Sequence, residues 1–127
     1  MKIIFLSKRQ YMRKDVLDDK YARLYELPAN LFQNGHEIIG VCLSYRQKNQ
    51  GVILNKTDNN HRFEWHSYNF FQRGLPNIRY IQSLFQLILD FKPDILIGSS
   101  DALHLILTRW LAKRFNISYA VDIYDNF

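Results

Sequence analysis

Residues 94 to 125 constrain the fold more than any other part of this sequence, because they carry the pattern of a β-α-β unit. The run from Ile95 to Ile97 is short and continuously apolar, as expected for a parallel strand that is buried on both faces. A segment with the helical period follows, and the run from Ile117 to Ile123 predicts the next strand. The residues expected on the buried face of the helix are Leu103, Ile106, Leu107, Trp110 and Leu111.

Five polar residues lie where these two predicted strands end. Ser99, Ser100 and Asp101 follow the first strand, and Asp122 and Asp125 lie at the end of the second. Ligands bind outside the carboxyl ends of the strands in open α/β sheets, so we predict that these residues line a binding site. Hydroxyl groups there can hydrogen-bond a polyol or a phosphate, and a carboxylate can orient a sugar hydroxyl or take its proton. Ser100 is also predicted to cap the following helix.

The remainder of the chain adds strands, a hairpin and two helices to this unit. Lys2 to Leu6 predicts a central strand, and Glu37 to Leu43 predicts a second one. A hairpin or two short strands are predicted at Val52 to Asn55 and Phe63 to Phe71. The resulting order predicts a single α/β domain over residues 1–127. Its sheet is expected to be Rossmann-like, open and mainly parallel, with helices on both faces and a β-hairpin insertion.

Turn and capping residues mark the two remaining helices. The first has Asp18 or Asp19 as its predicted N-cap and ends at Asn34-Gly35, and Pro28 predicts a kink or a restart within it. The second is capped by Asn77. The buried face of the first helix is predicted to comprise Tyr21, Leu24, Tyr25, Leu31 and Phe32. That of the second is predicted to comprise Ile78, Ile81, Leu84, Phe85, Ile88 and Phe91.

A basic segment follows the first predicted strand directly. Residues 7 to 14 carry four cations, Lys8, Arg9, Arg13 and Lys14, and no acidic residue. Because this segment lies at the carboxyl end of a central strand, it is a candidate contact for a phosphate or an anionic lipid headgroup. The other interpretation, a solvated and mobile surface loop, is equally compatible with the sequence.

Composition limits the classes of protein to which this chain can belong. With 127 residues, 47% of them hydrophobic and 23% charged, it has the make-up of one globular domain. The single cysteine, Cys42, excludes an internal disulfide, and its position in a predicted strand favours a small buried side chain over a nucleophile. No apolar run is long enough for a signal-peptide core or a membrane span, which predicts a cytoplasmic location. The formal net charge of +5 favours anionic partners.

Several enzyme classes are disfavoured because their short motifs are absent. The sequence contains no G-x-G-x-x-G, G-x-x-x-x-G-K-[ST], H-E-x-x-H, C-x-x-C or G-x-S-x-G, which argues against dinucleotide dehydrogenases, P-loop enzymes and serine hydrolases. His61 and His66 lie near Asp58 and Glu64, but their spacing matches no familiar metal site. We therefore predict no metal and no bound cofactor. Nucleic acid is a disfavoured partner, because no RNP pattern or zinc-finger spacing is present.

Four segments carry a resemblance to a known family by their order and spacing. They are the initial Met-Lys-Ile-Ile-Phe-Leu, the helix end and strand entry from Leu31 to Ile38, the strand entry from Lys92 to Gly98, and the strand exit from Val121 to Asp125. Together they resemble the N-terminal domain of glycosyltransferase family 4 enzymes, which have the GT-B fold. The resemblance covers nearly the whole chain.

This resemblance implies a retaining, metal-independent transferase with two lobes. The chain would be the lobe that binds a glycan or lipid-linked acceptor of cell-envelope polysaccharide synthesis, and a C-terminal lobe beyond Phe127 would bind most of the nucleotide sugar. The fragment alone is then expected to be inactive. Asp125 matches the aspartate of a His-Asp motif found in many family members, whereas Tyr124 replaces the histidine. Asp125 is therefore the catalytic candidate, and the polar and basic residues named above are the candidates for acceptor binding.

An alternative function remains open at this stage. The basic segment and the absence of catalytic motifs are also compatible with a non-catalytic Rossmann-like module that binds anionic ligands, either nucleic acid or an acidic membrane surface. In both cases the expected location is cytoplasmic, and peripheral contact with the inner face of an anionic membrane is kept as an option.

Overall fold

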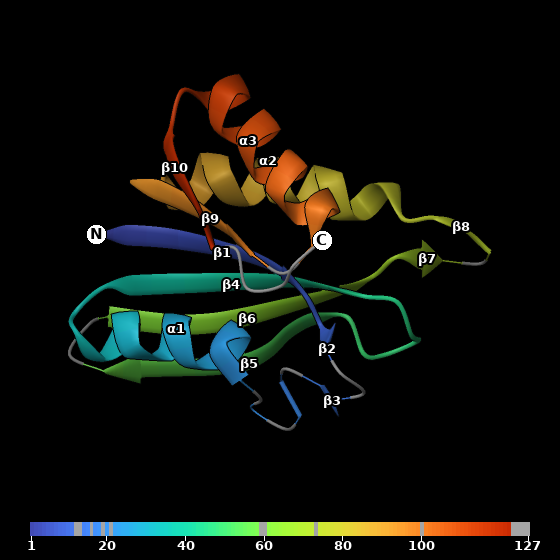
Figure 1. Cartoon of the computed structure of the whole chain (residues 1–127), viewed down its shortest axis with the longest axis horizontal. Helices are drawn as coiled ribbons and strands as arrows, with labels where there is room; N and C mark the ends of the chain where they lie inside the picture. The colour runs from blue at the N-terminus through green and yellow to red at the C-terminus, as the bar shows by residue number, and fades with distance from the viewer. Residues whose placement is uncertain are drawn as a thin grey trace.

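The computed structural model describes residues 1–11, 14–15, 17–18, 20, 22–58, 61–72, 74–99 and 101–122, and for residues 11, 14, 22–23, 54–58 and 72 the backbone alone. One six-stranded sheet with helices on both faces dominates it (Figure 1). The strands of this sheet are β1 (Lys2–Lys8), β4 (Glu37–Ser44), β5 (Gly51–Asp58), β6 (His61–Asn69), β9 (Ile95–Ser99) and β10 (Ser118–Asp122). The helices are α1 (Ala22–Gln33), α2 (Ile78–Phe91) and α3 (Ala102–Phe115). Two short ladders pair β2 (Gln10–Tyr11) with β3 (Lys14–Asp15) and β7 (Phe71–Gln72) with β8 (Leu75–Pro76).

The strand order β10-β9-β1-β4-β6-β5 confirms the predicted Rossmann-like, mainly parallel sheet. β1 lies inside the sheet and pairs in parallel with β4 on one side and β9 on the other. The chain builds outward from β1 through β4 to β6, then returns across the sheet through α2 to build β9 and β10. The strand order therefore reverses between β1 and β9. Ligands bind at such a switch point in open α/β sheets.

The predicted hairpin is present and supplies the third parallel strand. β5 and β6 pair antiparallel, and β6 also pairs in parallel with β4, so β5 forms the edge of the sheet. Every second residue of β6 is buried, as its alternating sequence predicts. Trp65 packs where Gly40 of β4 has no side chain, since a Cβ there would lie 2.5 Å from the indole.

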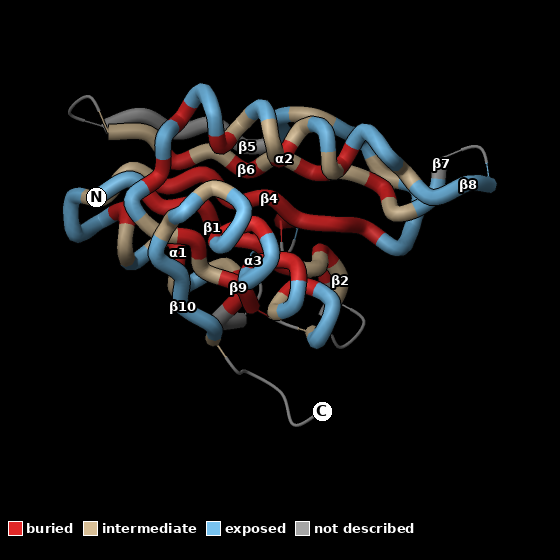
Figure 2. Tube along the Cα trace, turned by 90° about the horizontal axis from the view of Figure 1, so that it is seen from above, coloured by how far each residue is buried: buried red, intermediate tan, exposed pale blue. Residues whose placement is uncertain are grey.

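Two apolar layers cover the two faces of the sheet. Alternate residues of β1 enter different layers, with Ile3 and Phe5 facing α1 and Ile4 and Leu6 facing α2 and α3. Figure 1 shows α1 on one side of the sheet and the other two helices on the opposite side. In Figure 2 the central strands are buried along most of their length, while the outward sides of the helices are exposed. Among the described residues, no helix is long and apolar enough to cross a membrane.

The helix α1 ends as predicted but begins differently. At its C-terminus Gly35 has φ 93°, and hydrogen bonds run from Gly35 N to Phe32 O and from His36 N to Leu31 O, which is a Schellman motif. The helix is continuous through Pro28, so the predicted restart does not occur. Asp18 is not its cap, because the helix begins at Ala22 and the Asp18 carboxylate binds elsewhere. The alternative cap Asp19 and the predicted core residue Tyr21 lie outside the described residues.

The helix α2 has the predicted cap and most of the predicted buried face. The Asn77 side chain accepts a hydrogen bond from Arg79 N, as an N-cap does. Leu84, Ile88 and Phe91 are buried, and Ile81 and Phe85 pack against the same core. Ile78, in contrast, is the first residue of the helix and is 71% exposed. Tyr80, which the apolar pattern did not mark, is buried instead.

The predicted buried face of α3 is partly wrong, because the helix is rotated about its axis. Its buried residues include His104, Thr108 and Leu111, whereas Ile106 and Trp110 are exposed. Gly98 of β9 explains the rotation. A Cβ at Gly98 would lie 2.1 Å from Thr108 Oγ1, so only glycine lets the helix approach the sheet along this polar face. The Thr108 hydroxyl donates to His104 O at 2.6 Å, which satisfies it inside the core.

Candidate functional site

The predicted site residues that the structure describes lie at the carboxyl ends of β1, β9 and β10. Lys8 is the last residue of β1, and Ser99 is the last residue of β9. The Ser99 hydroxyl donates to Asp122 O at 3.3 Å and to Asp122 Oδ2 at 3.4 Å, which joins the ends of β9 and β10. Asp101 follows β9 and is the N-cap of α3, with His104 N donating to its Oδ1 at 3.0 Å. The assignment of the cap to Ser100 is therefore wrong.

Other predicted site residues cannot be placed in the same way. Arg13, Ser100 and Asp125 lie outside the described residues, and for Lys14 the structure describes the backbone alone. Their roles in binding or catalysis remain predictions.

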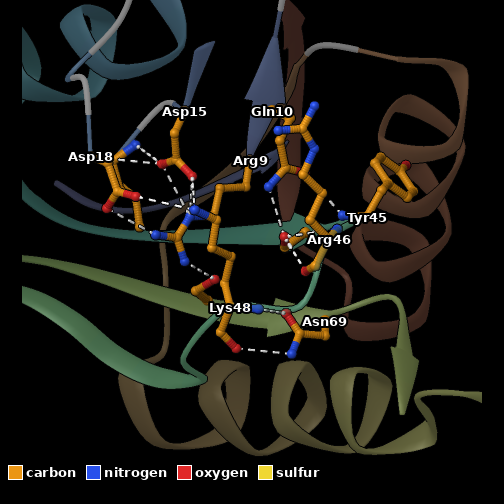
Figure 3. A network of polar contacts seen from close by, with 11 residues as sticks. Arg9, Gln10, Asp15, Asp18, Tyr45, Arg46, Lys48 and Asn69 are labelled. Atoms are coloured by element: carbon orange, nitrogen blue, oxygen red, sulfur yellow. Dashed lines mark hydrogen bonds and ion pairs between the residues drawn. The ribbon is translucent and has the colours of Figure 1, made fainter. Parts of the chain in front are cut away.

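Arg9 lies in a buried ion-pair network instead of on an open basic loop (Figure 3). Its Nε donates to Asp15 Oδ2 at 2.9 Å, its Nη1 to Ser67 Oγ at 2.9 Å, and its Nη2 to Asp18 Oδ1 at 3.1 Å. Lys48 Nζ lies 3.4 Å from Asp18 Oδ2 on the outer side of the network. The sequence segment from 7 to 14 contains no acid, but both carboxylates come from the residues directly after it. The Arg9 guanidinium is thus neutralised within the protein.

The carboxylate of Asp15 organises the turn that follows the basic segment. Its Oδ1 accepts hydrogen bonds from Leu17 N and Asp18 N, both at 2.9 Å. Burial acts to raise the pKa of Asp15, but the Asp18 N–H, the Arg9 guanidinium and the Leu17 N–H outweigh it. The pKa of Asp15 therefore lies below its usual value of 3.8, and the carboxylate is charged.

The loop after β4 is held against the ends of β1 and β6. Gln10 donates through Nε2 to Ser44 Oγ at 2.7 Å and accepts from Tyr45 N at 2.9 Å (Figure 3). On the other side, Asn69 accepts from Lys48 N at 3.1 Å and donates to Lys48 O at 2.9 Å. These reciprocal contacts fix the position of Tyr45 at the edge of the sheet where the predicted site lies.

Tyr45, Asp101 and His104 form a chain of polar contacts across this edge. The Tyr45 hydroxyl donates to Asp101 Oδ2 at 3.0 Å, and His104 Nδ1 contacts Asp101 Oδ1. Burial acts to raise the pKa of Asp101, but the bonds from His104 and Tyr45 outweigh it and lower the pKa from 3.8 to about 2. Burial and then the Asp101 charge raise the pKa of Tyr45, so the phenol keeps its proton.

The contact with Asp101 indicates the tautomer of His104. An ionised carboxylate only accepts hydrogen bonds, so Nδ1 of His104 carries a proton. His104 is fully buried, and among the described residues its Nε2 has no hydrogen-bond partner. The pair therefore presents a charged, half-buried carboxylate held in place from behind by the histidine, with the Tyr45 hydroxyl beside it.

A row of small polar side chains crosses the sheet at the same edge on the face toward α1. Ser7, Cys42 and Ser67 are paired in register on β1, β4 and β6. Ser99 and Asp122 are paired on β9 and β10, directly beyond the last β1–β9 pair. Ser7, Ser67 and Ser99 are all buried, and no described group hydrogen-bonds the Ser7 hydroxyl. The carboxyl end of the sheet is thus polar where its middle is apolar.

On the opposite face, an apolar pocket opens at the same end of the sheet. It has a volume of 180 Å³ and lies between the starts of α2 and α3, over the ends of β4 and β6. Its walls include Leu43, Phe70, Tyr80 and Leu107. The Tyr45 ring packs on Phe70, with ring centroids 5.5 Å apart, so the polar chain from Tyr45 to His104 runs along the rim of the pocket.

Sequence reasoning missed Tyr45, Tyr80 and His104 as site residues. Tyr45 follows the predicted second strand directly, so its position at a strand end was a usable signal. His104 lies three residues after a possible aspartate cap, which was a second signal. Tyr80 carried none, because it lies within a helix whose apolar pattern is complete without it.

No metal site is found in the part of the chain that the structure describes, where no group of three or more His, Cys, Asp or Glu side chains could hold an ion. His66 and Glu64, which the sequence placed near each other, are hydrogen-bonded to each other, with Nε2 of His66 3.1 Å from Oε2 of Glu64. The described arrangement can therefore bind hydroxyl groups, through Asp101, Asp122 and Tyr45, and an apolar group in the neighbouring pocket.

Comparisons with known proteins add no assignment, since no protein-family model matches the chain and no curated protein matches it in sequence.

Proposed function

We propose that this chain is the acceptor-binding lobe of a retaining glycosyltransferase with two Rossmann-like lobes. In this proposal a second lobe binds most of the nucleotide sugar, and the sugar passes to a glycan or lipid-linked acceptor of cell-envelope polysaccharide synthesis. The family resemblance is to glycosyltransferase family 4. The observation that carries the proposal is the convergence of hydrogen-bonding side chains from β1, β4, β9 and β10 at one edge of the sheet.

The position of these side chains supports acceptor binding. The order of the strands reverses between β1 and β9, and Lys8 and Ser99 end those two strands. Asp101 and Asp122 add carboxylates beside this point, and carboxylates commonly hydrogen-bond sugar hydroxyls. Asp101 Oδ1 is engaged by His104 and Oδ2 accepts from the Tyr45 hydroxyl, so the ionised carboxylate has room to accept one further hydrogen bond from a sugar hydroxyl.

The chemistry of transfer requires groups beyond those described. Transfer needs an oriented acceptor hydroxyl and stabilisation of the departing diphosphate. The edge of this lobe supplies orientation, and Asp125 is the candidate to contact the reacting sugars. Stabilisation of the diphosphate falls to the second lobe in this proposal. Arg9 is not assigned to it, because its guanidinium is already paired with Asp15 and Asp18.

The decisive experiment uses the longer protein that the gene would encode beyond Phe127. Release of nucleoside diphosphate is measured from UDP-glucose, UDP-N-acetylglucosamine and GDP-mannose, with a lipid extract as the source of acceptor. Asp125→Ala is expected to lower the rate by about tenfold or more, whereas Glu26→Ala on the exposed side of α1 leaves it unchanged.

Three results would count against the proposal. One is a reading frame that ends at Phe127, because no second lobe then exists. Another is an unchanged rate in Asp125→Ala. The third is binding of one of these sugar nucleotides to the present chain with a Kd below about 10 μM, since the donor is assigned mainly to the other lobe.

A second candidate function is docking to an anionic membrane, and the exposed side of α3 favours it. Leu103, Ile106 and Trp110 are 44%, 69% and 47% exposed, and Arg109 and Lys113 lie on the same side. The helix contains no acidic residue. Apolar side chains, a tryptophan and cations on one helix face are typical of helices that lie in a membrane interface. This surface replaces the basic segment as the basis for the alternative, because Arg9 is buried.

Sedimentation with lipid vesicles tests this second function. Binding to vesicles of phosphatidylcholine with phosphatidylserine should exceed binding to phosphatidylcholine alone and should fall as salt is added. Ile106→Ser should weaken it. The matched control is Ile78→Ser, which removes an isoleucine of similar exposure, 71%, from the start of α2. Two results would exclude α3 as the docking surface. One is an equal loss of vesicle binding in the two variants, and the other is vesicle binding that does not increase when phosphatidylserine is present.

A further inference from the structure

The apolar pocket and the polar edge of the candidate site share one rim, which Tyr45 forms. The Tyr45 ring packs on Phe70, a wall of the pocket, with ring centroids 5.5 Å apart. At the other end of the same ring, the hydroxyl donates to Asp101 Oδ2 at 3.0 Å. Leu103, which also lines the pocket, follows Asp101 by two residues at the start of α3. A ligand that fills the pocket therefore reaches the rim beside the Asp101 carboxylate.

The two polar side chains of this rim are open to solvent. The side chain of Asp101 is 27% exposed, and Tyr45 is 45% exposed. Because His104 engages Asp101 Oδ1 and Tyr45 engages Oδ2, the carboxylate keeps one acceptor position. The phenol of Tyr45 gives its own proton to Asp101, so its oxygen is able to accept a hydrogen bond in turn. The rim thus offers acceptor positions to the hydroxyl groups of a ligand.

The pocket itself offers a ligand no free donor among the residues that line it. Asn77 donates both amide protons, to Gln50 Oε1 at 3.0 Å and to Asn69 O at 2.9 Å. The Tyr80 hydroxyl is buried, so that residue contributes only its ring. The other walls are the apolar side chains of Leu43, Phe70, Pro76, Ile81, Leu103 and Leu107. A sugar ring in the pocket would lose its hydrogen bonds to water without replacement, whereas a hydrocarbon group would gain free energy from burial.

The size of the pocket limits the hydrocarbon group. An apolar cavity of about 150 Å³ in another protein binds benzene, so 180 Å³ holds about six carbon atoms. Leu103 in the wall is 44% exposed, so a longer chain can leave the pocket toward solvent.

We propose that one ligand spans the rim and the pocket. Its hydroxylated head group bonds to Asp101 and Tyr45, and an aliphatic chain joined to the head group fills the pocket with about six carbons. The inference rests on the proposed function in taking this ligand as the acceptor, and it selects a lipid-linked acceptor over a free glycan.

A series of alkyl glucosides tests the proposal on the present chain. Methyl, butyl, hexyl and octyl β-D-glucosides share one head group and differ only in the length of the chain. Each is titrated below its micelle concentration, and amide NMR shifts give the Kd, which is expected to be about 0.1 to 1 mM for hexyl glucoside. Each buried methylene should tighten binding about fourfold, so butyl glucoside should bind about sixtyfold more tightly than methyl glucoside. Octyl glucoside should bind no more than about twofold more tightly than hexyl glucoside, because the pocket is then full.

Two variants separate the head group from the chain. Asp101→Asn keeps a residue that caps helices but removes the charge, so it should weaken butyl and hexyl glucoside by the same factor, about tenfold. Leu103→Glu places a carboxylate in the wall of the pocket, so hexyl glucoside should bind no more tightly than methyl glucoside. The matched control is Ile106→Glu on the same helix, which should leave every Kd unchanged, since Ile106 is 69% exposed and does not line the pocket.

The proposal is overturned by any of three results. The first is a Kd that does not depend on chain length, which is the result expected for a free glycan acceptor. The second is a gain in affinity that continues undiminished from hexyl to octyl glucoside or survives in Leu103→Glu, because the chain then binds outside the pocket. The third is unchanged binding of butyl and hexyl glucoside in Asp101→Asn, because the head group then lies elsewhere.

Two further comparisons identify the source of the chain and keep this inference separate from sugar transfer. Pentyl and 3-methylbut-2-enyl glucosides both carry five carbons, so tighter binding of the second supports the proposal with a prenyl chain, and tighter binding of the first supports it with an alkyl or acyl chain. Chain-dependent binding here, with no transfer by the longer protein, would overturn the proposed function alone. Transfer by the longer protein, with no dependence of binding on chain length, would overturn this inference alone.

Discussion

Replacing Arg9 by alanine tests whether this residue is a structural part of the fold. The Arg9 side chain is 4% exposed and that of Asp15 is 11% exposed, so the substitution removes the guanidinium from a buried carboxylate, which keeps a longer contact of 3.8 Å to Lys48 Nζ. Breaking such a pair costs about 3 to 5 kcal/mol. The contribution of Asp18 is small, because its side chain is 56% exposed and exposed pairs contribute less than about 1 kcal/mol. Ser67 also loses a partner inside the core.

The expected loss is therefore about 4 kcal/mol in the free energy of unfolding at neutral pH. Urea unfolding followed by tryptophan fluorescence measures it, because Trp65 is fully buried and reports on the core. With a slope of roughly 1.5 kcal/mol per molar urea, the midpoint should fall by about 2 to 3 M. The control is Arg114→Ala in the exposed last turn of α3, which should cost less than about 1 kcal/mol.

The pH dependence gives this experiment a second readout. In the wild type the pKa of Asp15 is below its unfolded value of 3.8, so its stabilising contribution is complete above that pH and is lost as the pH falls through the folded value. In Arg9→Ala the Asp15 carboxylate has lost the guanidinium, and acid neutralises its charge. The stability difference between the two proteins should therefore shrink below pH 4. A loss under about 1 kcal/mol at neutral pH, or a difference that does not change in acid, would refute a structural role for the pair.

Three further outcomes are expected. The pKa of Asp101 is 3.8 in the unfolded chain and about 2 in the folded protein. The free energy of unfolding of the wild type should therefore drop by about 2 kcal/mol as the pH falls from 3.8 to 2, and Asp101→Asn should lack this drop. Gly98→Ala should lower stability in urea by about 1 to 3 kcal/mol through the clash with Thr108, and Thr108→Ala should partly restore it; no loss would contradict the proposed helix approach. Burial raises the pKa of the Cys42 thiol to about 12, so iodoacetamide should label it at pH 8 only as fast as the protein unfolds, and immediate labelling would show an open thiol.

Patterns of nearby residues predicted the elements of the fold well. The continuous apolar run of β1, the alternation of β6 and the Asn34-Gly35 helix end each express a preference that acts within a few residues of the chain. The order of these elements also predicted the sheet, because crossover connections between parallel strands have few alternatives. The same rule predicted the position of the strand ends, and Ser99, Asp101 and Asp122 lie at one edge of the sheet, while their role in binding stays a prediction.

Local patterns failed where the environment of a residue comes from distant parts of the chain. The apolar residues of α3 predicted one buried face, but Gly98 on the neighbouring strand admits a different one. The basic segment suggested four free cations, yet Arg9 donates to Ser67, 58 residues away. The contact between Tyr45 and Asp101 spans 56 residues and left no mark in either local sequence.

The sequence by itself thus determined which segments are strands and helices, their order, and the edge of the sheet where polar groups collect. Tertiary structure alone decided which of those groups are paired inside the protein, as Arg9 is with Asp15 and Asp101 is with Tyr45. The physical reason is that helix and strand preferences are set by neighbours along the chain. Burial, charge pairing and cavities are set by side chains that meet only after the sheet has formed.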